Sequence, residues 1–177
     1  MNEITPRILI AGIGNIFLGD DAFGAEVAQR LLKRPHPANV RVEDFGIRGL
    51  DLTYRLLEDF DVAILIDAAP RGKPVGTLTL IEPEAADLAA PMGADAAMLD
   101  THNMDPLKVL RYVTTLGGTL RRVLVLACEP QPLEAEYDDM QMGLSEPVSA
   151  AVDEAVVMIE SLVAELSGVA CTSSPSH

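Results

Sequence analysis

Cysteine is scarce in this chain, which has two cysteines, Cys128 and Cys171, among its 177 residues. The two lie far apart and match no metal-binding spacing, so we expect neither a cysteine metal site nor a disulfide. Cys128 ends an apolar segment, which favours a buried structural thiol over a nucleophile. Cys171 lies in the Ser-rich end of the chain, residues 169–177, which we expect to form a disordered tail.

Cations are also few, because 13 lysines and arginines stand against 27 aspartates and glutamates, for a net charge of −14. This charge repels nucleic acid and anionic membranes, so we expect neither as a partner. A basic peptide or a metal-bearing protein suits it better. No apolar run reaches the ~18 residues of a membrane span, and no signal-peptide pattern opens the chain. We therefore expect a soluble, cytoplasmic protein.

Strand and helix patterns alternate along the chain. Continuous apolar runs predict buried parallel strands at 8–13, 61–67 and 122–128. Residues 39–45 alternate as an edge strand does, and residues 76–82 follow the preceding strand too closely for a parallel crossover. Helical spacing of apolar residues predicts helices at 22–34, 50–59, 106–116 and 146–167. We expect Asp105 and Ser145 to be the N-caps of the last two helices, and Pro106 to occupy the first helical position after Asp105. We predict one α/β domain over residues 1–168, a three-layer α/β/α sandwich. Its mostly parallel five-stranded sheet has the order 2-1-3-5-4, with the fourth strand antiparallel.

The segment 8–24 is the most informative one, because an apolar strand runs into a glycine turn that is followed by two acids, Asp20 and Asp21. Three interpretations compete. A dinucleotide-binding turn would need a glycine where the chain has Phe17, and the two acids would repel a diphosphate. A purely structural turn would use the acids to cap the next helix. An acidic active site would use one acid as the cap and direct the other into the crevice above the sheet.

Two more residues favour the active-site interpretation. Asp67 ends a buried strand, where an unpaired carboxylate would be costly. The predicted strand order makes the first and third strands neighbours, so Asp21 and Asp67 face one crevice, and His102 can reach it from a long loop. Two carboxylates and one imidazole suit a divalent ion such as nickel or zinc. Taken singly, His102 is better explained as a helix-entry residue that caps or packs locally, and Asp67 is consistent with an acceptor of backbone hydrogen bonds.

The segment Gly-Ile-Gly-Asn-Ile-Phe-Leu-Gly-Asp-Asp-Ala-Phe-Gly, residues 12–24, resembles the N-terminal signature of the nickel–iron hydrogenase maturation endopeptidases. Cys-Glu-Pro at 128–130 and Gly-Leu-Ser at 143–145 resemble later landmarks of that family, so the similarity spans about residues 7–165. The resemblance implies a phosphorylase/hydrolase-like fold and a peptidase. Its partner would be a hydrogenase large-subunit precursor, from which it removes a C-terminal peptide after nickel insertion.

The same resemblance implies roles for the three crevice residues. Asp21, Asp67 and His102 match the family's metal ligands, and the metal is nickel carried by the substrate, with zinc or another divalent ion as the alternative. Asp21 and Asp67 would also be the catalytic residues. Either the carboxylate pair activates a water or bound metal supplies Lewis acidity, and the sequence does not separate the two.

The chain departs from the family after the second strand. Family members commonly carry an Asp-Gly-Gly-Thr-type turn, whereas this chain has Asp44-Phe45-Gly46-Ile47-Arg48-Gly49. We expect Asp44, Gly46 and Arg48 to bind substrate. We also expect Phe45 and Arg48 to change the wall of the pocket, with Arg48 as a cation near the acids. A nucleotide- or metabolite-binding α/β module, or a metal-binding chaperone without peptidase activity, stay open as alternatives.

Overall fold

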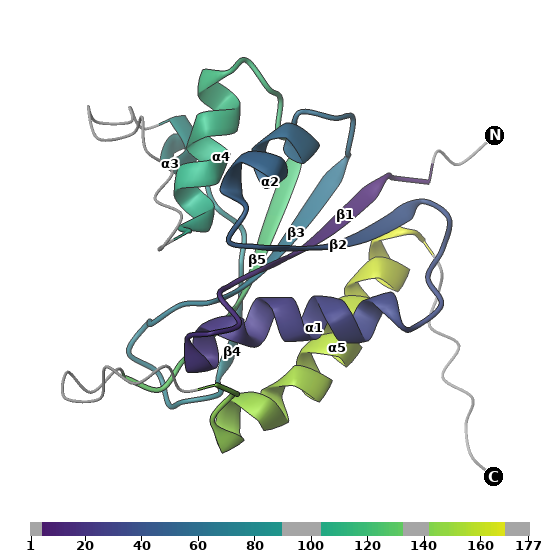
Figure 1. The fold of residues 1–177 in the computed structure, drawn as a ribbon. Helices are drawn as coiled ribbons and strands as arrows, with labels where there is room; N and C mark the ends of the chain where they lie inside the picture. The colour runs from purple at the N-terminus through teal and green to yellow at the C-terminus, as the bar shows by residue number, and fades with distance from the viewer. Residues whose placement is uncertain (1–4, 90–103, 133–141, 169–177) are drawn as a thin grey trace, which may run out of the picture.

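The computed structural model describes residues 5–89, 104–132 and 142–168 (Figure 1). His102 and the expected tail at 169–177 lie outside the described residues. The strands are β1 (Ile8–Ile13), β2 (Val40–Gly46), β3 (Val62–Ala68), β4 (Leu78–Ile81) and β5 (Arg122–Cys128). The helices are η1 (Gly19–Ala22), α1 (Phe23–Leu32), α2 (Gly49–Leu56), α3 (Ala85–Ala89), α4 (Pro106–Thr115) and α5 (Glu146–Leu166).

The sheet has the predicted strand order, β2-β1-β3-β5-β4. All neighbouring strands are parallel except β4, which runs antiparallel to β5. In the register of β1 and β3, Gly12 lies opposite Ile66. The carboxyl ends of these two strands therefore lie side by side, and their connections leave in different directions, which is the arrangement that creates a crevice in open α/β sheets.

Helices cover both faces of the sheet, which confirms the three-layer sandwich. Helices α1 and α5 lie side by side on one face, and α2 and α4 lie on the other (Figure 1). Alternate residues of β1 pack in the cores on the two faces of the sheet, because successive side chains of a strand point to opposite faces. Ile8 and Ile10 belong to the core under α1 and α5, whereas Leu9 and Ala11 belong to the core under α2 and α4.

The first turn of α1 packs directly against the sheet backbone. A side chain at Gly24 would overlap the carbonyl oxygens of Ile13 in β1 and Ile66 in β3. Glycine is therefore required at this position for steric reasons. The close contact fixes the start of α1 above the carboxyl ends of the two central strands.

The predicted N-terminal cap is observed at α4 and is absent at α1. Asp105 caps α4, because its side chain accepts a hydrogen bond from the backbone N–H of Leu107 at 2.9 Å. The prediction that Asp20 or Asp21 caps α1 is wrong, since neither η1 nor α1 has a side-chain cap hydrogen bond.

Among the described residues, no helix combines the length and the apolar character that a membrane span requires.

Gly24→Ala should lower the free energy of unfolding by about 3 kcal/mol, because the new methyl group meets backbone atoms that cannot move aside without disturbing two strands. Gly49→Ala is the matched control at the start of another helix. Its methyl group would lie 3.0 Å from the sulfur of Met104, a flexible side chain, so we expect almost no loss of stability. Urea unfolding of both variants measures the difference. Equal midpoints would contradict the packing described for α1.

Candidate active site

Asp21 and Asp67 lie close enough for their charges to interact. Asp67, at the carboxyl end of β3, is 6% exposed. Burial, and next the charge of Asp21, raise the pKa of Asp67 well above its usual value, against a hydrogen bond from the backbone of Ala68. Burial also raises the pKa of Asp21, whose carboxylate accepts a 2.8 Å hydrogen bond from the N–H of Asn15 that acts in the other direction. The structure therefore brings together two of the three predicted site residues.

The glycine turn places Asp21. Gly14 has a φ of +142°, and a side chain there would overlap the carbonyl oxygen of Asp21. The N–H of Gly14 donates to the carbonyl oxygen of Gly46 at 2.9 Å, which joins the turn to the end of β2. The glycine turn thus lets the backbone after β1 approach the residue that carries the acid, as the active-site interpretation of this segment requires.

Asp20 has a structural role that differs from that of Asp21. Its buried carboxylate accepts hydrogen bonds from the N–H of Gln131 at 2.8 Å, from the N–H of Ser145 at 2.6 Å and from the Ser145 hydroxyl at 2.9 Å. Ser145 occupies the predicted N-cap position of α5, but its side chain makes no cap hydrogen bond. Asp20 therefore ties η1 to the segment after β5 and to the start of α5.

Glu129, the middle residue of the Cys-Glu-Pro segment, is a second structural acid, to which we assigned no role from the sequence. It is 7% exposed, and its carboxylate accepts hydrogen bonds from the N–H groups of Arg71 at 2.7 Å and Gly72 at 3.1 Å. These contacts hold the connection after β3 against the end of β5. In the sequence, its position directly after a buried strand was the feature that could have indicated this role.

The neighbouring Cys128 is the predicted structural thiol, since burial raises its pKa to about 12 and keeps it protonated.

A third acid lies near the pair. The charge of Asp105, at the N-cap of α4, contributes to the raised pKa of Asp67. Within residues 5–89, 104–132 and 142–168, no group of three or more His, Cys, Asp or Glu side chains is arranged to hold a metal ion. The predicted metal site thus depends on His102, which lies outside these ranges.

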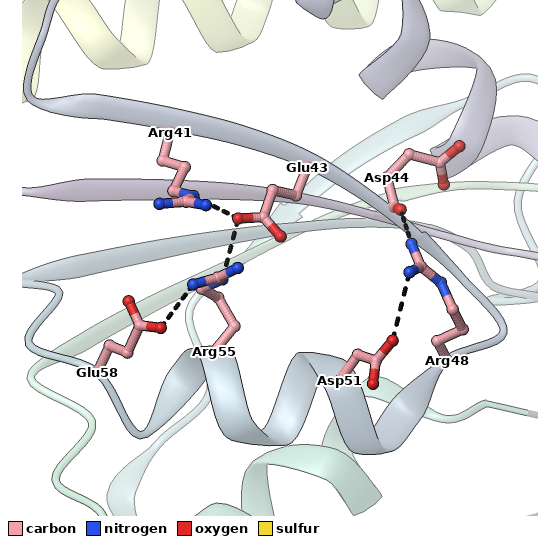
Figure 2. A network of polar contacts seen from close by, with 7 residues as sticks. All are labelled: Arg41, Glu43, Asp44, Arg48, Asp51, Arg55 and Glu58. Carbon is pink, nitrogen blue, oxygen red and sulfur yellow. Dashed lines mark hydrogen bonds and ion pairs between the residues drawn. The ribbon is translucent and has the colours of Figure 1, made fainter.

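The turn after β2 separates the predicted substrate-binding residues. The Asp44 carboxylate accepts hydrogen bonds from the N–H of Gly46 at 2.9 Å and from Nε2 of Gln29, on α1, at 3.0 Å. Arg48 instead donates to the carbonyl oxygens of Asp44 and Phe45 and pairs with Asp51 on α2 at 3.3 Å. Figure 2 shows the Asp44 carboxylate pointing away from Arg48. Asp44 therefore makes its side-chain contact with α1 on one face of the sheet, and Arg48 makes its ion pair with α2 on the other.

The expected effect of Phe45 on a pocket wall is wrong. Phe45 is 2% exposed and packs in the core under α2 and α4, because its side chain points to the opposite face from that of Asp44. The outer part of β2 carries ion pairs instead. Glu43 contacts both Arg41 and Arg55, which links this edge strand to α2 (Figure 2). These pairs are partly exposed, so each stabilises the fold by only about 1 kcal/mol or less.

Asp67→Asn should stabilise the protein by an amount that grows with pH. The folded-state pKa of Asp67 lies above the unfolded value, so the wild type loses stability as pH rises from the unfolded pKa through the folded pKa. Asparagine does not titrate, and the gain amounts to about 1.4 kcal/mol for each pH unit between the two pKa values. Urea unfolding from about pH 4 upward measures it. Asp59→Asn, at an exposed acid, is the control, and parallel curves for Asp67→Asn and wild type would contradict the strained burial of Asp67.

Comparison with known proteins places these features in a family. Residues 25–162 match the model of the hydrogenase maturation protease family. A protein of Methanocaldococcus jannaschii named as a hydrogenase maturation protease is 34% identical over 153 residues, which cover 86% of this chain and 93% of that protein. The hydrogenase expression/formation protein HupD of Rhodobacter capsulatus is 31% identical over 151 residues, which cover 85% of this chain and 70% of that protein.

Solved structures of the same family share the fold. The hydrogenase maturating endopeptidase HybD of E. coli aligns with a TM-score of 0.69 and 25% identity, over 90% of this chain and 93% of that one. A hydrogenase 2 maturation peptidase from a Thaumarchaeota archaeon aligns with a TM-score of 0.63 and 28% identity, over 88% and 97% of the two chains. Because sequence and fold agree along nearly the whole described chain, this protein belongs to the hydrogenase maturation protease family and is a peptidase.

Proposed function

We propose that this peptidase removes the C-terminal peptide of a nickel–iron hydrogenase large-subunit precursor after nickel has been inserted. The observation that carries the proposal is the carboxylate pair, which brings together Asp21 of η1, a partly buried residue, and Asp67, buried at the end of β3. Among the described residues, neither acid forms an ion pair. Two close and unneutralised acids favour the approach of a cation.

The donor set fits a divalent ion carried by the substrate. Carboxylate oxygens together with an imidazole nitrogen suit nickel or zinc. His102 is the proposed third ligand. It precedes Asp105 by three residues, and chain connectivity alone keeps the two Cα atoms within about 11 Å of each other. Because the charge of Asp105 acts on Asp67, this connectivity supports a place for His102 at the same site.

The carboxylate pair supports acid–base hydrolysis of a peptide bond. Two acids with raised pKa values favour a state in which one is ionised and the other protonated. The ionised acid takes a proton from water as the water oxygen bonds to the carbonyl carbon. The protonated acid then gives its proton to the leaving nitrogen as the C–N bond breaks. Nickel carried by the substrate would serve as a recognition element. Where it is bound by both carboxylates, they have lost their protons, and the metal would supply Lewis acidity in place of the protonated acid.

Asp21→Asn and Asp67→Asn should each lower the rate of precursor cleavage by roughly 100-fold or more, because each removes one member of the acid–base pair. The assay incubates the enzyme with the nickel-loaded precursor and follows release of the C-terminal peptide by mass spectrometry. Asp59→Asn should cleave at the wild-type rate. If the wild-type enzyme leaves a matched nickel-loaded precursor intact, the proposed function is wrong.

Binding of nickel or zinc ions to the free enzyme should weaken as pH falls, since the carboxylates and His102 must lose protons to bind metal. His102→Ala should weaken the binding at all pH values and leave unfolding by urea unchanged. Isothermal calorimetry with nickel chloride measures both effects. Unchanged affinity in His102→Ala would remove this residue from the proposed ligand set.

A further inference from the structure

Helix α2 and its C-terminal cap expose a row of large apolar side chains, the α2 stripe. Its members Leu50, Tyr54 and Leu57 are 52%, 66% and 38% exposed, whereas Leu52 and Leu56 of the same helix are 0% and 4% exposed. The stripe residues are four and three positions apart, which places them on one side of the helix. One side of α2 therefore packs in the core, and a second apolar side is left in contact with solvent.

A row of charged side chains, the α2 charge row, runs beside the stripe. Arg48, Asp51, Arg55 and Glu58 follow one another along one side of α2 (Figure 2). Arg48 pairs with Asp51 at 3.3 Å, and Arg55 pairs with Glu58. The last three members of the row each come directly after a stripe residue. Because neighbouring residues of a helix are about 100° apart, the stripe and the charge row form one continuous exposed surface.

The pattern of this surface is the same in both directions of the helix. The charge row alternates arginine and acid at spacings of three, four and three, so an antiparallel copy brings every arginine opposite an acid. In the stripe, the same reversal brings Leu50 opposite Leu57 and Tyr54 opposite its own copy. The charge row is centred on residue 53 and the stripe between residues 53 and 54, so one alignment satisfies both.

We propose that two copies of this chain form a dimer through α2, with the two helices antiparallel. A two-fold axis perpendicular to the helices puts stripe against stripe and places both charge rows on the same side, where opposite charges meet. A parallel pair of helices would place the charge rows on opposite sides and leave them apart. Contact between the stripes removes apolar surface from water, which stabilises the dimer.

The charges of this surface favour a second copy over a strongly basic or acidic partner. The two arginines and two acids of the charge row cancel, whereas the whole chain carries a net charge of −14. Two copies therefore repel each other less at α2 than their net charges alone would require. A partner with charges of one sign gains nothing from an alternating row. The surface is small, so we expect a weak dimer whose population depends on protein concentration.

The antiparallel arrangement keeps the two proposed active sites apart. Helix α2 begins at Gly49, shortly after the carboxyl end of β2. Reversing one helix places the carboxyl ends of the two sheets at opposite ends of the helix pair, so each carboxylate pair stays accessible from its own side. The dimer thus goes beyond the proposed function and does not depend on it.

Analytical ultracentrifugation of the purified protein, without precursor, tests the inference. Wild type should change from monomer to dimer as its concentration rises. Tyr54→Ser should raise the dissociation constant at least about tenfold, because a tyrosine at the centre of an interface is often one of its strongest contacts. Val157→Ser is the matched control, at a 60% exposed apolar residue of α5 on the other face of the sheet, and should leave the dissociation constant unchanged.

Two charge reversals test the antiparallel register. In Asp51→Arg and in Arg55→Asp, two copies of one variant place like charges opposite each other, so each variant alone should be monomeric where wild type is dimeric. An equimolar mixture should form a heterodimer, since the arginines of one variant meet the acids of the other. Urea unfolding of each variant confirms that it is folded before the mixture is made.

Three results overturn the inference. The first is a wild type that sediments as a monomer up to about 1 mM. The second is a dimer that Tyr54→Ser does not weaken, and the third is a mixture of the two folded charge variants that stays monomeric. A monomeric wild type together with a raised KM for precursor cleavage in Tyr54→Ser would assign the surface to the precursor. Because the sedimentation experiments contain no precursor, their outcome is independent of whether the proposed function holds.

Discussion

The direct packing of α1 on the two central strands is the constraint on which the rest of the structure depends. Because Gly24 has no side chain, the first turn of this helix lies against the backbones of Ile13 and Ile66. The residues before the helix must then turn within a short space, which Gly14 permits at positive φ. This geometry determines the position of Asp21, because its carbonyl oxygen occupies the space that a side chain at position 14 would take.

Backbone hydrogen bonds divide the acids at the carboxyl ends of the strands into two kinds. Asp20 and Glu129 each accept at least two hydrogen bonds from N–H groups of other segments, so their charges are used to hold loops. Asp67 is buried and Asp21 is partly buried, each has fewer donors, and the pKa values of both are raised. A carboxylate whose charge is poorly compensated is available for a proton or a cation. This difference separates the two acids that hold loops from the two that we propose for the chemistry.

The turn after β2 shows how a departure from a family pattern acts through structure. Phe45 enters the core, and Arg48 binds backbone carbonyl groups on the α2 side. Asp44 alone of these three residues faces α1, where it lines, with Glu26, a pocket between α1 and the start of α5. Phe45 and Arg48 therefore support the turn through the core and through backbone carbonyl groups.

The sequence alone determined the sheet order, the antiparallel β4 and the helix cap at Asp105, because each depends on local apolar patterns, connection lengths or capping chemistry. It also determined that Asp67 ends a buried strand. Only the tertiary structure decided which of the adjacent acids, Asp20 and Asp21, holds a loop. Their neighbours in the chain are the same, and the groups that distinguish them, Gln131 and Ser145, are more than a hundred residues away in sequence. Contacts at that separation arise from folding and leave no periodic signal in the chain.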